Sequence, residues 1–404
     1  MKILLVNDYG TPTGGAELLM LALRDGLRQR GHDARLFATG VSIGAHQPQA
    51  DYTCIGTTSS WRTLLQSGNP WAMGKLRQVL RAFQPDVVHV KIFLTQLSPL
   101  ILPLLKSFPS LYYVAWYRPI CPLGNKILPD GSPCQDPYGA ACYRHRCLPL
   151  HDWLPLMAQM RQWQHWRRCF SRVVANSYAV QRQLGAAGIE THGVIECGVP
   201  VRPMRPNLVS VPTVVFAGRL VREKGVDVLV KAFARVRQDC PEARLLIAGD
   251  GSERDRLHAL VNQLNLADHV DLLGHLPQAE MEQRFRQAWV QAVPSRWAEP
   301  FGMVAAEAMM RGTAVVATAA GGLAEVVQDP KTGILVPPES VEQLAHALRR
   351  LLRDRVLAEQ MGQTGREVAL AQFSATVFVD KFIQQYEELL ENPVTLERSD
   401  ACAA

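Results

Sequence analysis

The fold class is decided by the stretch Ser295-Arg-Trp-Ala-Glu-Pro-Phe-Gly-Met-Val-Ala-Ala-Glu307, which joins two elements. The apolar run at 289–293 predicts a buried strand, and residues 303–310 predict a helix. Pro300 suits a helix entry, and Gly302 lets the backbone approach a ligand closely. Strand, turn and helix in this order form the repeating unit of a parallel α/β sheet.

Two carboxylates bracket the start of this predicted helix. Glu299 is expected at the C-terminal tip of the strand and Glu307 inside the helix. In an open parallel sheet ligands bind at strand tips, and the unpaired N–H groups of a helix start favour a phosphate. The two carboxylates could bind hydroxyls while the backbone of the helix start binds a phosphate, and this combination fits a sugar nucleotide. A capped core helix with two solvent-facing glutamates has the same spacing, so the spacing alone leaves both interpretations open.

The length of 404 residues exceeds that of a single core and predicts two domains. Strand-like runs alternate with helical segments in both halves, which predicts parallel sheets covered by helices. Four prolines between Gly198 and Pro212 predict a stiff linker. The expected parts are an N-terminal domain at 1–198 with an insertion at 117–150, a linker at 199–212, a C-terminal domain at 213–374, a helix at 375–392 and a disordered tail at 393–404.

Charge is distributed unevenly along the chain. Residues 1–200 contain 20 Lys and Arg residues against 11 Asp and Glu residues, although the whole chain has a net charge of only +6. A basic N-terminal half favours an anionic acceptor or a membrane surface. Because no long run of lysines or arginines and no nucleic-acid motif is present, we expect no nucleic-acid partner.

The first residues resemble a short strand more than a signal peptide, and no apolar run is long enough to span a membrane. We therefore expect a cytoplasmic protein. The segment 151–170 is rich in Trp and Arg, with its apolar side predicted to face the core. Peripheral contact with the inner face of the membrane through this segment is the alternative that its composition leaves open.

Glycines and cations follow other predicted strand tips. Gly14 and Gly15 lead from the first strand into a helix, which fits an anion cradle as well as a plain tight turn. Arg219 and Lys224 follow a strand that begins at Thr213 and precede a helix, so they fit a diphosphate site as well as ordinary surface charge. The glycine spacing does not match the G-x-G-x-x-G fingerprint, so a nicotinamide cofactor is not expected.

With seven residues between its acids, the stretch from Glu299 to Glu307 resembles the E-x7-E motif of the retaining GT-B glycosyltransferases. This large family includes sucrose-phosphate synthase and many bacterial polysaccharide transferases. The Gly-Arg-Leu and Lys-Gly text around Arg219 and Lys224 is similar to the same family, as is the first loop. The resemblance spans nearly the whole chain. It implies a GT-B fold of two facing Rossmann-like domains with an interdomain cleft, and a last helix that returns to the N-terminal domain.

The resemblance also implies a role for each matching residue. Glu299 would contact the hydroxyls of the donor sugar and Glu307 the nucleotide ribose. Arg219 and Lys224 would bind the diphosphate and stabilise the leaving group. The other implied donor-binding positions lie in glycine-led loops and at helix starts: Gly14, Gly15, Gly218, Gly249, Gly274, His275, Phe301, Gly302, Met303 and Val304.

Two positions depart from the family pattern. The family often has His-x-His where this chain has His89 and Lys91, and we include His89 among the catalytic residues, with a structural histidine as the alternative. Ala115 and Trp116 replace a His-Asp pair found in many relatives. Either a neighbour such as His89, Tyr117 or Arg118 supplies polar contacts, or the protein handles its acceptor differently. A non-catalytic sugar-nucleotide-binding partner of an active transferase is the alternative.

Four of the nine cysteines, Cys121, Cys134, Cys142 and Cys147, cluster in the insertion. Cytosolic redox conditions disfavour stable disulfides, and four thiolates can hold a structural zinc that staples a core-poor loop. No C-x-x-C spacing is present. Packed thiols, a structural zinc and disulfides therefore all stay open, and none of them would be catalytic.

The expected function is that of a metal-independent retaining glycosyltransferase of the hexosyltransferase class. It would move a sugar from a nucleoside-diphosphate sugar to an acceptor hydroxyl in polysaccharide, glycolipid or other glycoconjugate biosynthesis, with no further cofactor. The N-terminal domain would hold a glycan, lipid-linked or small-molecule acceptor, and the C-terminal domain the donor. A GT-B sugar-nucleotide epimerase is an alternative that the E-x7-E pattern disfavours.

Overall fold

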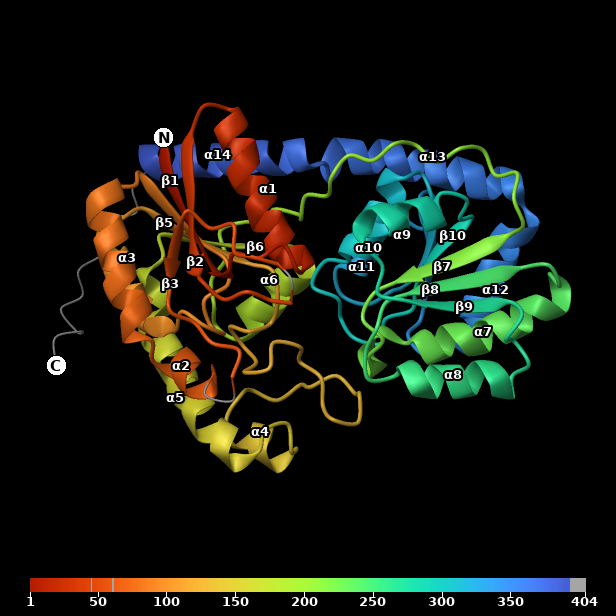
Figure 1. Cartoon of the computed structure of the whole chain (residues 1–404), viewed down its shortest axis with the longest axis horizontal. Helices are drawn as coiled ribbons and strands as arrows, with labels where there is room; N and C mark the ends of the chain where they lie inside the picture. Colours follow the sequence, from red (N-terminus) through yellow and green to blue (C-terminus); the bar gives the residue numbers. More distant parts are fainter. Residues whose placement is uncertain (45, 60–61, 393–404) are drawn as a thin grey trace. The chain divides into compact units, whose positions relative to one another are not determined.

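The computed structural model describes residues 1–44, 46–59 and 62–392. They form two compact units (Figure 1). The first contains residues 1–126, residues 135–198 and the C-terminal helix from Ala375, and the second contains residues 127–134 and 199–374. Each unit is built on a six-stranded parallel sheet with helices around it, which confirms the predicted α/β fold class.

The sheet of the first unit has the strand order β3-β2-β1-β4-β5-β6, and every neighbouring pair is parallel. Its central strands are continuous apolar runs because helices cover both faces, so successive residues from Ile3 to Val6 are all fully buried. The strands are β1 (Lys2–Tyr9), β2 (Asp33–Thr39), β3 (Tyr52–Cys54), β4 (Val87–Val90), β5 (Ser110–Val114) and β6 (Arg172–Ala175).

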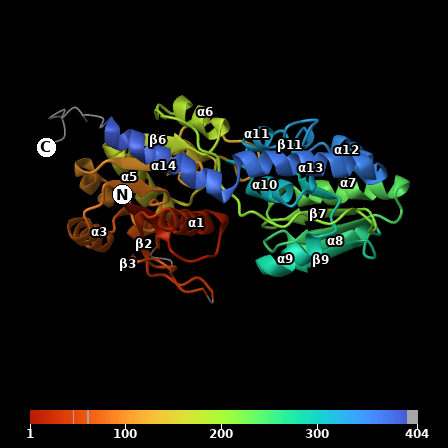
Figure 2. The ribbon, with the colours of Figure 1, turned by 90° about the horizontal axis from the view of Figure 1, so that it is seen from above.

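Side-chain caps begin two helices of this unit: Asn69 accepts from the N–H of Ala72, and Ser177 from that of Val180. Helix α14 packs against α1 (Figure 2), at Gly26, where a Cβ would lie 2.5 Å from Val379 Cγ2. The helices are α1 (Gly15–Gln29), α2 (Arg62–Ser67), α3 (Pro70–Phe83), α4 (Ala140–Arg144), α5 (Leu150–Trp166), α6 (Tyr178–Ala186) and α14 (Ala375–Glu391), with 3-10 segments η1 (Pro99–Ser107) and η2 (Arg167–Cys169).

The sheet of the second unit has the order β12-β11-β10-β7-β8-β9 and is also parallel throughout. Alternate residues of β7 enter different apolar clusters: Val214 and Phe216 belong to one, and Val215 to the other. The strands are β7 (Thr213–Ala217), β8 (Arg244–Ala248), β9 (Val270–Gly274), β10 (Val290–Val293), β11 (Ala314–Thr318) and β12 (Gly333–Val336).

Helix α7 packs beside α12, and α10 packs beside α13. The helix predicted at 303–310 is α10, and the strand predicted before it is β10, so this prediction is confirmed. The helices are α7 (Val226–Asp239), α8 (Arg254–Gln263), α9 (Gln278–Phe285), α10 (Met303–Met310), α11 (Leu323–Val326), α12 (Val341–Arg353) and α13 (Arg355–Gln372), with the 3-10 segment η3 (Arg222–Lys224).

Two segments differ from the predicted division of the chain. Residues 127–134, expected within the N-terminal insertion, group with the second unit. Residues 199–212 contain no helix or strand, but they pack on the second unit instead of standing free as a linker. Arg205 anchors them, because it is buried and its Nε donates to the carbonyl of Gly312 at 2.8 Å. The tail predicted at 393–404 lies outside the described residues.

Helix α5 has the predicted inward side, since Leu156, Met160 and Trp163 are all buried. In the part of the chain that the structure describes, no helix has the length and apolar character needed to cross a membrane. Peripheral contact of the α5 segment with a membrane stays a prediction.

Candidate functional site

In the second unit, the loops after β7 and β10 meet in a buried ion pair. The ammonium of Lys224 donates to Glu299 Oε1 at 2.5 Å, and the hydroxyl of Ser295 donates to the same oxygen at 2.6 Å. Glu299 is only 7% exposed. The Lys224 nitrogen also lies 5.6 Å from the centre of the Trp297 ring. Two residues predicted from separate motifs are therefore direct partners.

The charge state of Glu299 follows from these contacts. Burial, the strongest influence, would raise the pKa of the carboxyl, but the charge of Lys224 and the hydrogen bonds from Lys224 and Ser295 outweigh it and lower the pKa below its usual value. The carboxylate is therefore ionised at neutral pH. It can accept hydrogen bonds from sugar hydroxyls but has no proton to donate.

Arg296 ties the same two loops together. Its backbone N–H donates to the carbonyl of Glu223 at 2.8 Å, and its Nη1 donates to the carbonyl of Arg222 at 2.9 Å. The guanidinium also donates to both carboxylate oxygens of Asp227, at 2.6 and 2.9 Å. A bidentate pair of this kind fixes orientation as well as distance. This support was not predicted, because no local pattern relates Arg296 to an acid at the start of α7.

Three of the predicted glycines come together at the tips of β7, β8 and β9. The N–H of Gly218 donates to Ala248 at 3.0 Å, and the N–H of Gly249 donates to Gly274 at 2.7 Å. A Cβ on Gly249 would lie 1.8 Å from the Gly218 carbonyl oxygen, so only glycine permits this approach. His275 follows on the surface.

The start of α10 is held against the loop before α11. The N–H of Gly322 donates to the Glu299 carbonyl at 2.7 Å. Gly302 precedes the helix with a φ of 103°, and the N–H groups of Met303 and Val304 belong to the first turn, which lacks intrahelical partners. The Phe301 ring is 3% exposed and packs edge-on against Phe373, so its side chain belongs to the core. The predicted donor-binding role of this position named no side-chain contact and stays a prediction.

Arg219 and Glu307 stand apart from the ion pair. The Arg219 side chain is 69% exposed, with Nη2 3.6 Å from Glu223 Oε1. Glu307 is half-buried, and burial raises the pKa of its carboxyl, although the nearby Arg311 opposes this effect. Neither residue shares a hydrogen bond or ion pair with Lys224 or Glu299 among the residues described. Their donor roles stay predictions.

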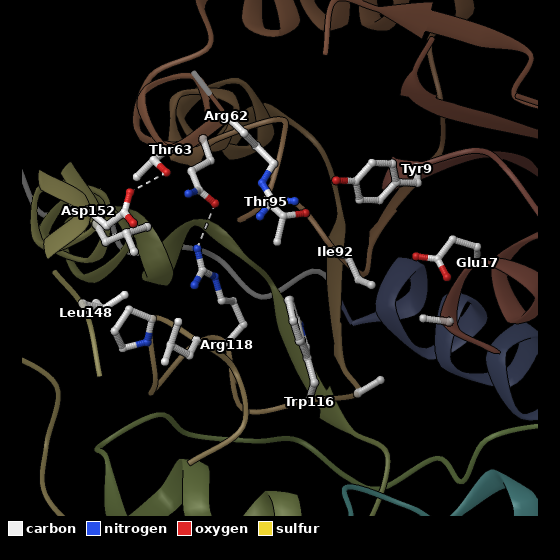
Figure 3. A pocket seen from close by; sticks show the side chains of 16 residues that line it. Tyr9, Glu17, Arg62, Thr63, Ile92, Thr95, Trp116, Arg118, Leu148 and Asp152 are labelled. Atoms are coloured by element: carbon white, nitrogen blue, oxygen red, sulfur yellow. Dashed lines mark hydrogen bonds between the residues drawn. The ribbon is translucent and has the colours of Figure 1, made fainter. Parts of the chain in front are cut away.

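The first unit contains a pocket of about 500 Å³ at the C-terminal ends of its strands (Figure 3). Gly14 precedes α1 and Gly15 begins it, and Glu17 in the same turn lines the pocket. Ala115 and Trp116, which stand where many relatives have a His-Asp pair, line it as well. Other lining residues come from distant segments and had no local signal in the sequence: Tyr9, Arg62, Thr95 and Asp152.

Two family models match this chain. Residues 206–368 match the family described as glycosyl transferases group 1, and residues 13–117 match glycosyltransferase family 4. These matches support an assignment to the GT-B glycosyltransferase group 1 family. The two matched ranges fall on different units, so each unit resembles a glycosyltransferase family.

Curated relatives match part of the chain. An exopolysaccharide phosphotransferase of Streptomyces coelicolor is 37% identical over 196 residues, which are 47% of this chain and 20% of the relative. A GDP-mannose-dependent phosphatidylinositol monomannoside mannosyltransferase of Mycobacterium tuberculosis is 39% identical over 168 residues, 40% of this chain and 44% of the relative. The chain thus spans less than half the length of each.

Solved structures match nearly the whole chain and show the fold. Sucrose-phosphate synthase from Thermosynechococcus elongatus has a TM-score of 0.73 at 23% identity, covering 97% of this chain and 99% of that one. The Anabaena protein HepE, in complex with UDP, has a TM-score of 0.69 at 22% identity, covering 96% of this chain and 100% of that one. The GT-B fold of two Rossmann-like units is therefore confirmed.

His89 does not lie at a site. Its imidazole is fully buried, its Nδ1 lies 2.6 Å from the Tyr386 hydroxyl, and its ring packs against Tyr113 and Phe382. Burial lowers the pKa of His89 to about 3, so the ring is neutral at any ordinary pH. The predicted catalytic role is inconsistent with this position, because α14 covers the strand at which the sequence suggested an open tip.

Lys91 is buried too, and its ammonium donates to the Ala16 carbonyl at 2.8 Å. Lys91 therefore stabilises the first turn of α1 and does not line the pocket of the first unit.

The clustered cysteines do not form the zinc site considered from the sequence. Among the residues described, no group of three or more His, Cys, Asp or Glu side chains could hold a metal ion. The insertion spreads its cysteines: Cys134 groups with the second unit, whereas Cys121, Cys142 and Cys147 belong to the first.

Proposed function

We propose that this protein is a retaining glycosyltransferase that moves a sugar from a nucleoside-diphosphate sugar to an acceptor hydroxyl. The observation that carries the proposal is the buried pair of Lys224 and Glu299, held where the loops after β7 and β10 meet. A cation and an ionised carboxylate at one strand-tip site suit a diphosphate and the hydroxyls of the attached sugar. The match of residues 206–368 to glycosyl transferases group 1 supports the same assignment.

The proposed reaction needs few groups from the protein. The bond between the anomeric carbon and the diphosphate oxygen breaks, and a bond to the acceptor oxygen forms on the same face of the sugar. The acceptor proton passes to an oxygen of the leaving phosphate. Lys224 has three N–H donors and Glu299 uses one of them, so others are available to balance charge on the leaving group. Arg219 is proposed as a second cation for the diphosphate, and catalysis is proposed to need no metal.

The acceptor and pathway belong to the same proposal. Relatives include an exopolysaccharide phosphotransferase and a phosphatidylinositol mannoside mannosyltransferase, so a glycan or a lipid-linked acceptor in glycoconjugate biosynthesis is proposed here. A non-catalytic sugar-nucleotide-binding partner is the second candidate. It is favoured by the replacement of the usual His-Asp pair with Ala115 and Trp116 and by the burial of His89.

Calorimetric titration with UDP, GDP and ADP tests the donor site. GDP and UDP are included because relatives are named or solved with these nucleotides. We expect one nucleotide to bind, and Arg219→Ala and Glu307→Ala to weaken it at least tenfold, about 1.4 kcal/mol for one charge-assisted contact. Arg284→Ala is the matched control, since Arg284 is also exposed and lies 3.9 Å from a glutamate four residues away.

The outcomes separate the candidates. Loss of binding in the Arg219 and Glu307 variants but not in the Arg284 variant supports the donor site. Binding without slow hydrolysis or transfer of the corresponding nucleotide sugar favours the non-catalytic partner. If none of the three nucleotides binds, the transferase proposal fails and the GT-B fold alone stands.

A further inference from the structure

The pocket of the first unit contains a buried arginine that forms no ion pair among the described residues. Arg118 is 4% exposed, and its Nη2 donates to three neutral oxygens: Gln66 Oε1 at 3.1 Å, the Leu94 carbonyl at 3.0 Å and Gln159 Oε1 at 3.0 Å. Its Nε has no hydrogen-bond partner among the described residues. No carboxylate in the described part of the chain bonds to it. A buried cation is costly unless something pairs with it, so the pocket is built to receive a negative group.

The neutral partners hold the guanidinium in place without quenching its charge. The Gln159 side-chain amide donates to the Leu94 carbonyl at 2.9 Å and also to the Gln66 carbonyl, which fixes the direction of its own oxygen toward Arg118. Burial lowers the pKa of Arg118 to about 10, so the group remains charged at neutral pH. The arginine is thus preorganised and positive before any ligand arrives.

A second arginine faces the same space. Arg62, at the start of α2, lines the pocket and makes no ion pair among the described residues. In Figure 3 the side chains of Arg62 and Arg118 extend toward one hollow. The carboxylate of Asp152, to which the neutral Thr63 Oγ1 donates at 2.9 Å, lines this end as well. Two arginines and one carboxylate therefore leave this end of the pocket with a net positive charge.

The rest of the pocket suits a sugar ring and its hydroxyls. Trp116 lies beside Arg118, and Gly124 packs closely against its ring, since a Cβ there would lie 2.8 Å from Trp116 Cε3. Figure 3 shows Glu17 at the other end of the pocket, beyond Tyr9, where a carboxylate can accept from a hydroxyl. The pocket therefore has a net positive end, formed by Arg62, Arg118 and Asp152, and a carboxylate at the other end.

We propose that this pocket takes an acceptor bearing an anionic group, a carboxylate or a phosphate, which binds Arg118 and Arg62 while its sugar ring lies against Trp116. This inference rests on the proposed function, because it names the class of acceptor for the same reaction. The basic character of residues 1–200 is consistent with it. A neutral sugar would leave the charge of Arg118 unpaired.

The test is calorimetric titration of the full chain with glucuronate, glucose 6-phosphate and glucose. We expect at least one anionic sugar to bind tenfold or more tightly than glucose, and Arg62→Gln to remove most of that preference. Binding of glucuronate alone identifies a carboxylate ligand, and binding of glucose 6-phosphate alone a phosphate. Arg118→Gln should abolish the preference, and because this buried change can disturb folding, the exposed Arg62 variant carries the argument.

Two controls make the result specific. Arg161→Gln, on the surface of α5 and outside the pocket lining, should bind as the parent does. Arg219→Ala should also leave anionic-sugar binding unchanged, which excludes binding at the donor site. Equal affinity for glucose and the anionic sugars, or no effect of Arg62→Gln, overturns the inference.

Nucleotide titrations on the same samples separate the two proposals. If a nucleotide binds but no anionic sugar does, the acceptor inference fails while the donor site stands. If an anionic sugar binds but no nucleotide does, the proposed function fails while the pocket remains.

Discussion

Replacing His89 by Gln tests whether this histidine is structural, as its position indicates, or catalytic, as the sequence suggested. Glutamine has a similar volume and can still hydrogen-bond to Tyr386, but it does not titrate. The fully buried His89 ring has a pKa of about 3 in the folded protein against an ordinary value of 6.5. The variant therefore removes one acid-sensitive group from the core of the first unit.

The sign of the effect follows from proton binding. Between pH 6.5 and 3 the unfolded chain protonates this histidine and the folded chain does not, so the histidine lowers the free energy of unfolding as the pH falls. The loss amounts to about 1.4 kcal/mol per pH unit, or about 2 kcal/mol at pH 5. His89→Gln should not show this loss in the free energy of unfolding, because glutamine does not titrate. The variant should be somewhat less stable than the parent at pH 7 and regain about 2 kcal/mol relative to it at pH 5.

Urea unfolding at pH 7 and pH 5, followed by tryptophan fluorescence, measures this difference, since Trp163 lies in the core of the same unit. Tyr386→Phe is the control, because it breaks the same hydrogen bond and keeps the histidine. It should lose about 1 kcal/mol at pH 7 and retain the parent's pH dependence. If the free energy of unfolding of His89→Gln depended on pH as the parent's does, the argument would be refuted. If the variant lost glycosyl transfer at pH 7 while keeping normal stability, His89 would be catalytic.

Two further changes probe the second unit. Gly322→Ala should weaken nucleotide binding at least tenfold and cost about 1–3 kcal/mol of stability, because its Cβ would lie 2.6 Å from Phe301 Cα and 2.7 Å from the Pro300 oxygen, both backbone atoms. Gly185→Ala is the control, because there is open space around Gly185. Equal changes in nucleotide affinity and stability in the two variants would contradict the packing argument. Lys224→Met should cost about 3–5 kcal/mol at pH 7, because it leaves the Glu299 carboxylate buried without its cation. In the parent, the lowered pKa of Glu299 gives stability that is constant above the ordinary value of 4.5 and is lost below it. In the variant, burial without the cation raises the pKa of the carboxyl, so folding is favoured by proton uptake above 4.5. The gap between parent and variant should therefore begin to shrink as the pH falls from 7 toward 4.5. Denaturation midpoints across this pH range measure the difference in stability between parent and variant. A difference independent of pH would exclude the ion pair as its cause. The double variant Lys224→Met with Glu299→Gln should recover part of the lost stability.

The sequence alone was sufficient for several elements of the second unit. The apolar run before Pro294 and the helix-forming residues after Gly302 interact with near neighbours, so β10 and α10 follow from local pattern. The glycines after β7, β8 and β9 were found for the same reason, since adjacent parallel strands bring their tips together. The pairing of Lys224 with Glu299 was not predicted, because 75 residues separate the two.

Errors arose where burial is decided by segments remote in the chain. His89 follows the pattern of an open strand tip, yet α14, almost 300 residues later, covers it. Residues 127–134 lie within the predicted insertion but group with the second unit.

Local pattern therefore determined the α/β class, the parallel arrangement of the strands and the strand-tip loops of the second unit. Tertiary structure alone decided which of those residues face solvent, which are buried, and which distant side chains meet in the pocket of the first unit. The physical reason is that periodicity and turn chemistry act over a few residues, whereas burial and charge pairing depend on whatever the fold brings alongside. Arg118 illustrates this: its sequence neighbours are unremarkable, and its unpaired buried charge exists because α2, α5 and the Leu94 backbone enclose it.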